Sequence, residues 1–184
     1  MMDHSMSGLD YQAIWNGALP FHDFVQAAAA DKRPLWEGMY RIARQPEELK
    51  APLGLAEPRR LLVIAADWCG DASNTIPAVA RWVEGQPGLE LRIVDRDRTP
   101  ALMDAYLTNG SRSIPIVIAL DAAFQPLGHW GPRPAELQAW VMAHKDTMEK
   151  EERYRHIRTW YARDRGFTTI RDIAALVTGA KVGA

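Results

Sequence analysis

Two apolar runs limit the possible folds more than any other feature of the sequence: the run that follows Arg60 up to Ala66, and Ile116–Leu120. A strand that is apolar on both faces is typical of a sheet covered by helices on both sides. The chain around these runs alternates between helical and strand-like patterns in the order β-α-β-α-β-β-α. We therefore expect a compact three-layer α/β domain. Its remaining elements are a helix over 71–84, a strand over 89–94, a short helix over 101–107, an edge strand over 126–130 and a helix over 134–143.

The segment before about Pro58 is predicted to be helical. Prolines at positions 20 and 34 are placed to open the second and third of three helices, and three further prolines then break the pattern. The third helix carries Leu35, Met39 and Ile42 on one apolar face at helical spacing. Trp36 and Met39 are among the large side chains of this segment that we expect to be buried. The first two helices carry the apolar sets Tyr11, Ile14, Trp15 and Phe21, Phe24, Val25.

The segment 146–184 is also predicted to be helical, with two apolar stripes. We expect it to pack on the α/β core within the chain, because a dozen large apolar side chains in the terminal segments are costly to leave in water. A homodimer that buries them is the alternative. The expected divisions are a helical extension over 1–58, the α/β domain over 59–145 and a second extension over 146–184. The stripes are Tyr154, Ile157, Trp160, Tyr161 and Phe167, Ile170, Ile173, Ala174, Val177.

Composition excludes several classes of protein. With 47% apolar residues and a net charge of −1, the chain is neither disordered nor attracted as a whole to nucleic acid or an anionic membrane. No apolar run approaches the length needed to span a bilayer. Residues 1–8 lack the basic and apolar regions of a signal peptide, so we expect a cytoplasmic protein. The spacing of the histidines predicts no metal site, and we expect no cofactor.

Cys69 is the single cysteine, so an intramolecular disulfide and a four-cysteine zinc site are both excluded. It lies between a buried strand and a predicted helix, where free backbone N–H groups favour a thiolate. Trp68 is expected to cover the sulfur in part, and Gly70 to let a partner chain approach. The alternative interpretation is a small buried core residue; the strand-Trp-Cys-Gly-helix context favours a site.

These residues resemble the thioredoxin family. Trp68-Cys69-Gly70 is similar to the Trp-Cys-Gly-Pro-Cys active-site turn, Pro77 matches a helix proline, and Gly131 matches the glycine before the last helix. Ser113-Ile114-Pro115 resembles the loop whose proline is cis. The resemblance covers roughly 60–144 and implies a thioredoxin-like fold, a central mixed sheet flanked by helices, with added terminal helices. It also implies a cis Pro115 and a role for the Ile114 backbone in binding substrate as an added strand.

The departures from the family bear on mechanism. Ala72 replaces the second cysteine, Asp71 replaces the intervening proline, and Val63 stands where the family has a buried aspartate. The intramolecular release step is therefore lost. Asp71 is expected to raise the thiol pKa by like-charge repulsion, or simply to be a favourable acid in the first turn of the helix; both can hold. We expect Cys69 to be partly accessible, with a pKa not far below its ordinary value of about 8.5.

Two functions follow as alternatives, and the sequence is compatible with an enzyme or a non-enzyme. The first is a monothiol thiol-disulfide oxidoreductase of cell redox homeostasis, acting through Cys69 on protein disulfides or mixed disulfides, with a low-molecular-weight thiol as resolver. The second is a redox-inactive binding or regulatory module that uses the cis-proline groove. A third interpretation places the function in the terminal helices, as dimerisation or partner docking.

Overall fold

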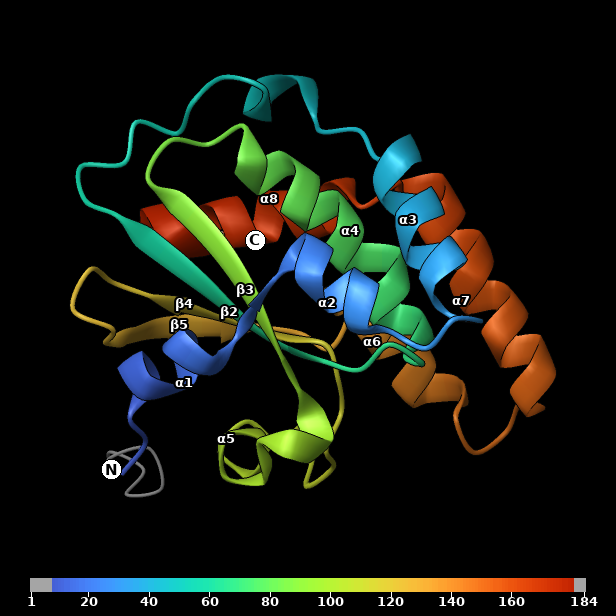
Figure 1. The fold of residues 1–184 in the computed structure, drawn as a ribbon. Helices are drawn as coiled ribbons and strands as arrows, with labels where there is room; N and C mark the ends of the chain where they lie inside the picture. The colour runs from blue at the N-terminus through green and yellow to red at the C-terminus, as the bar shows by residue number, and fades with distance from the viewer. Residues whose placement is uncertain (1–7, 181–184) are drawn as a thin grey trace.

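A five-stranded mixed sheet forms the centre of the chain in the computed structural model, which describes residues 8–180 (Figure 1). The strand order is β1-β3-β2-β4-β5. β2 runs parallel to β3 and antiparallel to β4, β5 is antiparallel to β4, and the short β1 is antiparallel to β3. The strands are β1 (Leu19–Pro20), β2 (Arg59–Ala65), β3 (Leu89–Asp95), β4 (Ile116–Leu120) and β5 (Pro126–Trp130).

The two apolar runs become the central strands β2 and β4. Val63 in the middle of β2 lies between Ile93 of β3 and Val117 of β4 and is fully buried. The sheet of the α/β domain is therefore the one that the sequence predicts. β1 was not expected: the two residues just before the second helix extend the sheet beyond β3.

Helices from both ends of the chain join the main core. Apolar side chains of α1, α2, α3 and α8 belong to the same buried cluster as the strands, among them Trp15, Phe24, Trp36 and Ile173. α3 packs on α4, and α8 packs on both β5 and α4. The helices are α1 (Tyr11–Gly17), α2 (Phe21–Ala27), α3 (Arg33–Ile42), α4 (Gly70–Glu84), α5 (Pro100–Asp104), α6 (Ala135–His144), α7 (Lys150–Asp164) and α8 (Phe167–Thr178), with short 3-10 turns at Glu47–Leu49 and Arg96–Arg98.

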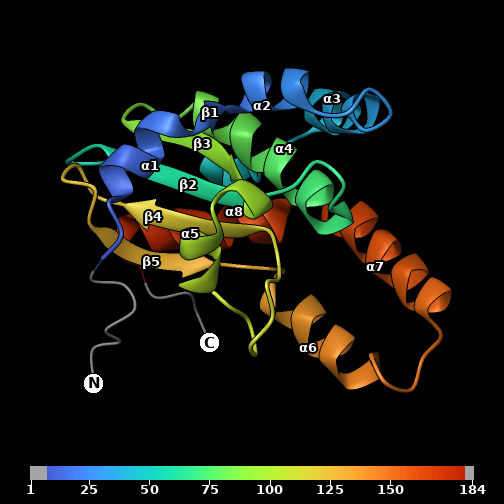
Figure 2. The same ribbon diagram turned by 60° about the horizontal axis from the view of Figure 1, so that its bottom comes forward.

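α6 and α7 form a hairpin that projects from the rest of the molecule (Figure 2). Their buried apolar residues form a second, smaller cluster of Leu137, Val141, Ile157 and Tyr161, separate from the main core. The predicted α7 stripe is correct for Ile157 and Tyr161 but wrong for Tyr154, which is 43% exposed.

The apolar face predicted for α3 is wrong for Leu35 and Ile42, whereas the expected burial of Trp36 is correct. Leu35 and Ile42 are 53% and 64% exposed, whereas Trp36 is completely buried. The indole of Trp36 packs edge-on against Phe24 of α2 and donates a hydrogen bond to the carbonyl of Asp67. A large aromatic side chain with a polar N–H to satisfy has determined which face of α3 points inward.

No helix within residues 8–180 has the length and apolarity that crossing a membrane requires.

Candidate functional site

Cys69 caps the N-terminus of α4. β2 ends at Ala65, and four residues later the Cys69 carbonyl accepts the hydrogen bond of Ser73 N–H that opens the helix. The Cys69 sulfur itself accepts from the backbone N–H of Ala72 at 3.5 Å. Free N–H groups at a helix start stabilise negative charge, so this contact lowers the pKa of the thiol.

The loop before β4 meets Cys69 from 45 residues away in sequence. The Ile114–Pro115 peptide bond is cis. The Cys69 thiol donates to the carbonyl oxygen of Ile114 at 3.5 Å, so the sulfur and the predicted binding backbone are in direct contact. Gly131 completes the loop cluster: its φ is +124°, and a Cβ on it would lie 2.2 Å from the Pro115 carbonyl oxygen, so only glycine fits.

Cys69 is less accessible than the sequence led us to expect. The residue is only 8% exposed, and burial raises the pKa of its thiol, with the Asp71 carboxylate raising it further. The Ala72 N–H and the Arg133 guanidinium act in the opposite direction but do not offset burial. The expectation of a pKa not far below its ordinary value is therefore wrong, and desolvation is the physical reason.

Asp71 is the centre of a polar network that sequence reasoning missed. Its two carboxylate oxygens accept hydrogen bonds from Arg133 Nε at 2.9 Å and Nη2 at 2.8 Å, and Tyr161 Oη donates to Oδ1 at 2.7 Å. Arg133 also donates to the side chain of Gln138. The side chains of Asp71 and Arg133 are 12% and 17% exposed, and Tyr161 is 3% exposed. Asp71 is thus a first-turn acid of α4 and also a partner for two residues from outside that helix.

No local sequence pattern predicts that Arg133 and Tyr161 bond to Asp71. Arg133 lies in the β5–α6 loop, where a surface arginine is ordinary, and Tyr161 reads as one member of an apolar stripe. Burial of the tyrosine beside a carboxylate raises the pKa of Tyr161 well above its usual range, so its hydroxyl stays a donor.

The other predicted site residues lie around the sulfur in different environments. Trp68 is 53% exposed, and the guanidinium of Arg96 lies 4.8 Å from its ring centroid. Gly70 is exposed at the start of α4, whereas Ala72 is completely buried. The site therefore has an exposed indole beside a buried thiol.

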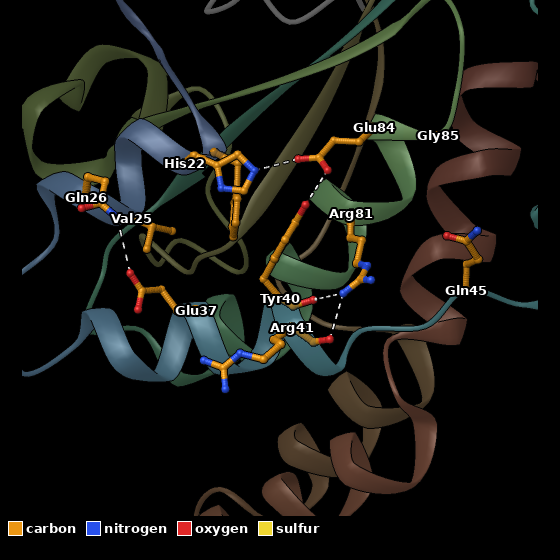
Figure 3. A pocket seen from close by; sticks show the side chains of 11 residues that line it. His22, Val25, Gln26, Glu37, Tyr40, Arg41, Gln45, Arg81, Glu84 and Gly85 are labelled. Carbon is orange, nitrogen blue, oxygen red and sulfur yellow. Dashed lines mark hydrogen bonds and ion pairs between the residues drawn. The ribbon is translucent and has the colours of Figure 1, made fainter.

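A separate hollow of about 740 Å³ lies where α2 and α3 meet α4 (Figure 3). In it, Glu84 receives a hydrogen bond from Tyr40 Oη and pairs with His22 Nε2 at 2.9 Å. Burial, followed by the Glu84 carboxylate, raises the pKa of Tyr40 to about 12. Arg81 donates to the carbonyls of Tyr40 and Arg41 at the end of α3. These polar groups largely satisfy one another, and no motif or spacing in the sequence predicts their arrangement.

Comparison with known proteins supports the fold. A family model described as thioredoxin matches residues 18–156. A crystal structure of a protein of unknown function from Pseudomonas aeruginosa is similar, with a TM-score of 0.75 and 22% identity over 94% of this chain and 99% of that one. An HIV epitope scaffold gives a TM-score of 0.74, also at 22% identity and with the same coverage of the two chains. No curated protein matched. The thioredoxin-like α/β fold predicted from the sequence is confirmed.

Proposed function

This chain belongs to the thioredoxin family, and from that premise we propose that it performs thiol-disulfide exchange through Cys69, as a monothiol with an external resolving thiol. The observation that carries the proposal is the position of the sulfur. It lies at the start of α4, within 3.5 Å of the Ala72 N–H and of the Ile114 carbonyl. A disulfide that pairs with the backbone of Ile114 would be brought next to the attacking sulfur.

The exchange has two steps. The Cys69 thiolate attacks one sulfur of a disulfide, R–S–S–R′; a Cys69–S–S–R bond forms and R′–S⁻ leaves with the electron pair. A second thiolate, R″–S⁻, then attacks the R sulfur of this adduct, so that R–S–S–R″ is released and the Cys69 thiolate is restored. Ala72 has no thiol, so R″–S⁻ comes from another molecule.

Each neighbouring residue has a defined role in this proposal. The Ala72 N–H stabilises the thiolate, and Ile114 presents backbone to the substrate. Gly70 leaves room beside the sulfur, because a Cβ there would meet nothing within 4 Å. Exposed Trp68 offers an apolar surface to the partner. The fully buried Val63 cannot accept a proton, which agrees with the absence of a second thiol to deprotonate.

A redox-inactive binding module is the second candidate. The observation that favours it is the 8% exposure of Cys69, together with the raised pKa of its thiol. In this alternative the loop at Ile114 and Pro115 binds a partner segment while the sulfur only fills space.

Incubation with oxidised glutathione distinguishes the two candidates. We expect the folded protein to gain one glutathione per chain by intact mass, and to lose it when reduced glutathione or another small thiol is added. Cys69→Ala is the control for specificity, and wild-type chain unfolded in urea is the control for reactivity of the thiol. If only the unfolded chain forms the adduct, the exchange function is refuted and the binding module is favoured.

A further inference from the structure

The polar network beside Cys69 includes a residue from beyond the part of the chain that the family model matches. The match ends at 156, yet Tyr161 of α7 donates its hydroxyl proton to Asp71, two residues after the cysteine. Arg133, which follows β5, donates hydrogen bonds to both oxygens of the same carboxylate. The Asp71 carboxylate on α4 thus bonds to Arg133 just before the α6–α7 hairpin and to Tyr161 near its end.

The hairpin is packed as a unit of its own. Its buried apolar side chains contact one another rather than the main core, and it projects from the sheet (Figure 2). At its C-terminal end, Arg165 and Gly166 have φ values of 59° and 78°, which separate α7 from the firmly packed α8. At its N-terminal end, Gly131 packs against the Pro115 carbonyl beside the site.

The boundary between α7 of the hairpin and the helices α3 and α4 is incompletely packed. A hollow of about 360 Å³ lies between α7 and the pair α3–α4, lined in part by Ile42, Met39 and Tyr161 itself. Tyr161 therefore has the hollow on one side and Asp71 on the other. The buried residues of the hairpin form a cluster separate from the main core, and the bonds of Arg133 and Tyr161 to the Asp71 carboxylate attach the hairpin to α4.

We propose that Tyr161 and Arg133 are positioning residues that latch the α6–α7 hairpin over Cys69, and that the sulfur reacts only when this latch opens. The inference rests on the proposed function in that it assigns a regulation to the same cysteine. The hairpin then decides when a disulfide reaches Cys69, and a partner that displaces α7 from α3 activates the site.

Alkylation of the single cysteine by iodoacetamide tests the latch without requiring any disulfide exchange. Tyr161→Phe removes one hydrogen bond to a charged acceptor, so opening should become about 10- to 100-fold more frequent and alkylation should accelerate accordingly. The increase should persist at pH values above the thiol pKa, where the fraction of thiolate no longer limits the rate. A residue that acted only on the charge of the sulfur would lose its effect there.

Tyr11→Phe is the matched control. Tyr11 is 6% exposed and its hydroxyl bonds to Tyr106 at 2.6 Å, so this variant also loses one buried phenol hydrogen bond, but none to Asp71. We expect its alkylation rate to stay within about twofold of wild type. Equal acceleration in both variants would show that Cys69 is exposed by general destabilisation, and no acceleration in Tyr161→Phe would show that the hydroxyl holds nothing closed; either result overturns the proposal.

Arg133→Lys is a second variant, for use if Tyr161→Phe folds poorly. It keeps the positive charge but loses the two-pronged contact with Asp71, so alkylation should again accelerate. The outcomes remain distinct from those of the glutathione experiment. Faster alkylation without any glutathione adduct supports the latch and refutes exchange, whereas a glutathione adduct that forms equally fast in wild type and Tyr161→Phe supports exchange and refutes the latch.

Discussion

Trp36 connects α3 to the loop before Cys69 through a hydrogen bond to Asp67. Its replacement by phenylalanine should lower the free energy of unfolding of the protein. The indole is completely buried and its N–H donates to the Asp67 carbonyl at 2.9 Å. Asp67 also accepts the backbone N–H of Ala29 through its carboxylate. Two bonds from the N-terminal segment therefore hold the loop just before the cysteine.

The size of the effect follows from two losses. The Asp67 carbonyl loses a partner in a partly buried position, at a cost of about 1–2 kcal/mol. The smaller phenyl ring leaves a cavity in a region of the core that cannot collapse freely, for about another 1 kcal/mol. For a chain of this length the sum of about 2–3 kcal/mol corresponds to a decrease in melting temperature of roughly 4–12 °C.

Urea unfolding followed by circular dichroism measures this loss, with Leu35→Ala as the control. Leu35 lies beside Trp36 on α3 but is 53% exposed, so its truncation should change the free energy of unfolding by less than about 0.5 kcal/mol. A Trp36→Phe variant as stable as wild type, or a Leu35→Ala variant as unstable as Trp36→Phe, would refute the packing argument for α3.

Three further predictions concern the thiol. Ala72→Cys should form an internal disulfide with Cys69 on oxidation, because the Ala72 N–H already contacts the sulfur; loss of both free thiols in a thiol assay would show it. Asp71→Asn should lower the Cys69 pKa, because it removes the carboxylate that raises it and leaves Arg133, so the midpoint of alkylation against pH should fall; an unchanged midpoint contradicts this. Wild type should lose stability relative to Cys69→Ala as pH rises above about 8.5: burial raises the folded pKa, so the native thiol keeps a proton that the unfolded thiol gives up. Urea midpoints for both proteins at pH 7 and 10 measure that difference.

The sequence predicts the parts of the fold that depend on local pattern. Continuous apolar runs indicate β2 and β4, and the change to helical spacing after Cys69 indicates α4. Because the short motifs at Cys69, Pro115 and Gly131 have a known spatial relation in the thioredoxin family, their resemblance also predicts that they meet, although they are far apart in the chain. The structure has these segments in contact.

Tertiary choices without a local signature escape this reasoning. Spacing placed Leu35 and Ile42 on the apolar face of α3, yet both are exposed. The helix turns the Trp36 indole inward instead, because the indole has both an aromatic neighbour and a carbonyl to bond. Likewise, the partners of Asp71 come from 62 and 90 residues away. Spacing within one helix carries no information about which distant side chains will compensate a buried charge.

Under the proposed latch, opening of the α6–α7 hairpin acts on Cys69 in two ways at once. It gives a disulfide access to the sulfur, and it readmits water to a thiol whose pKa is raised first of all by burial. The Ala72 N–H belongs to α4 itself and stays with the sulfur when the hairpin leaves. The largest cause that favours the thiolate is therefore kept and the main opposing cause, burial, is removed, although the smaller contribution of Arg133 is lost. Access and ionisation therefore increase together, and the gain in reactivity on opening exceeds the gain in exposure alone. A thiol without a resolving partner in its own turn stays capped until an external thiol attacks the adduct, and a closed hairpin that keeps the thiol protonated protects it from capping until a partner is present.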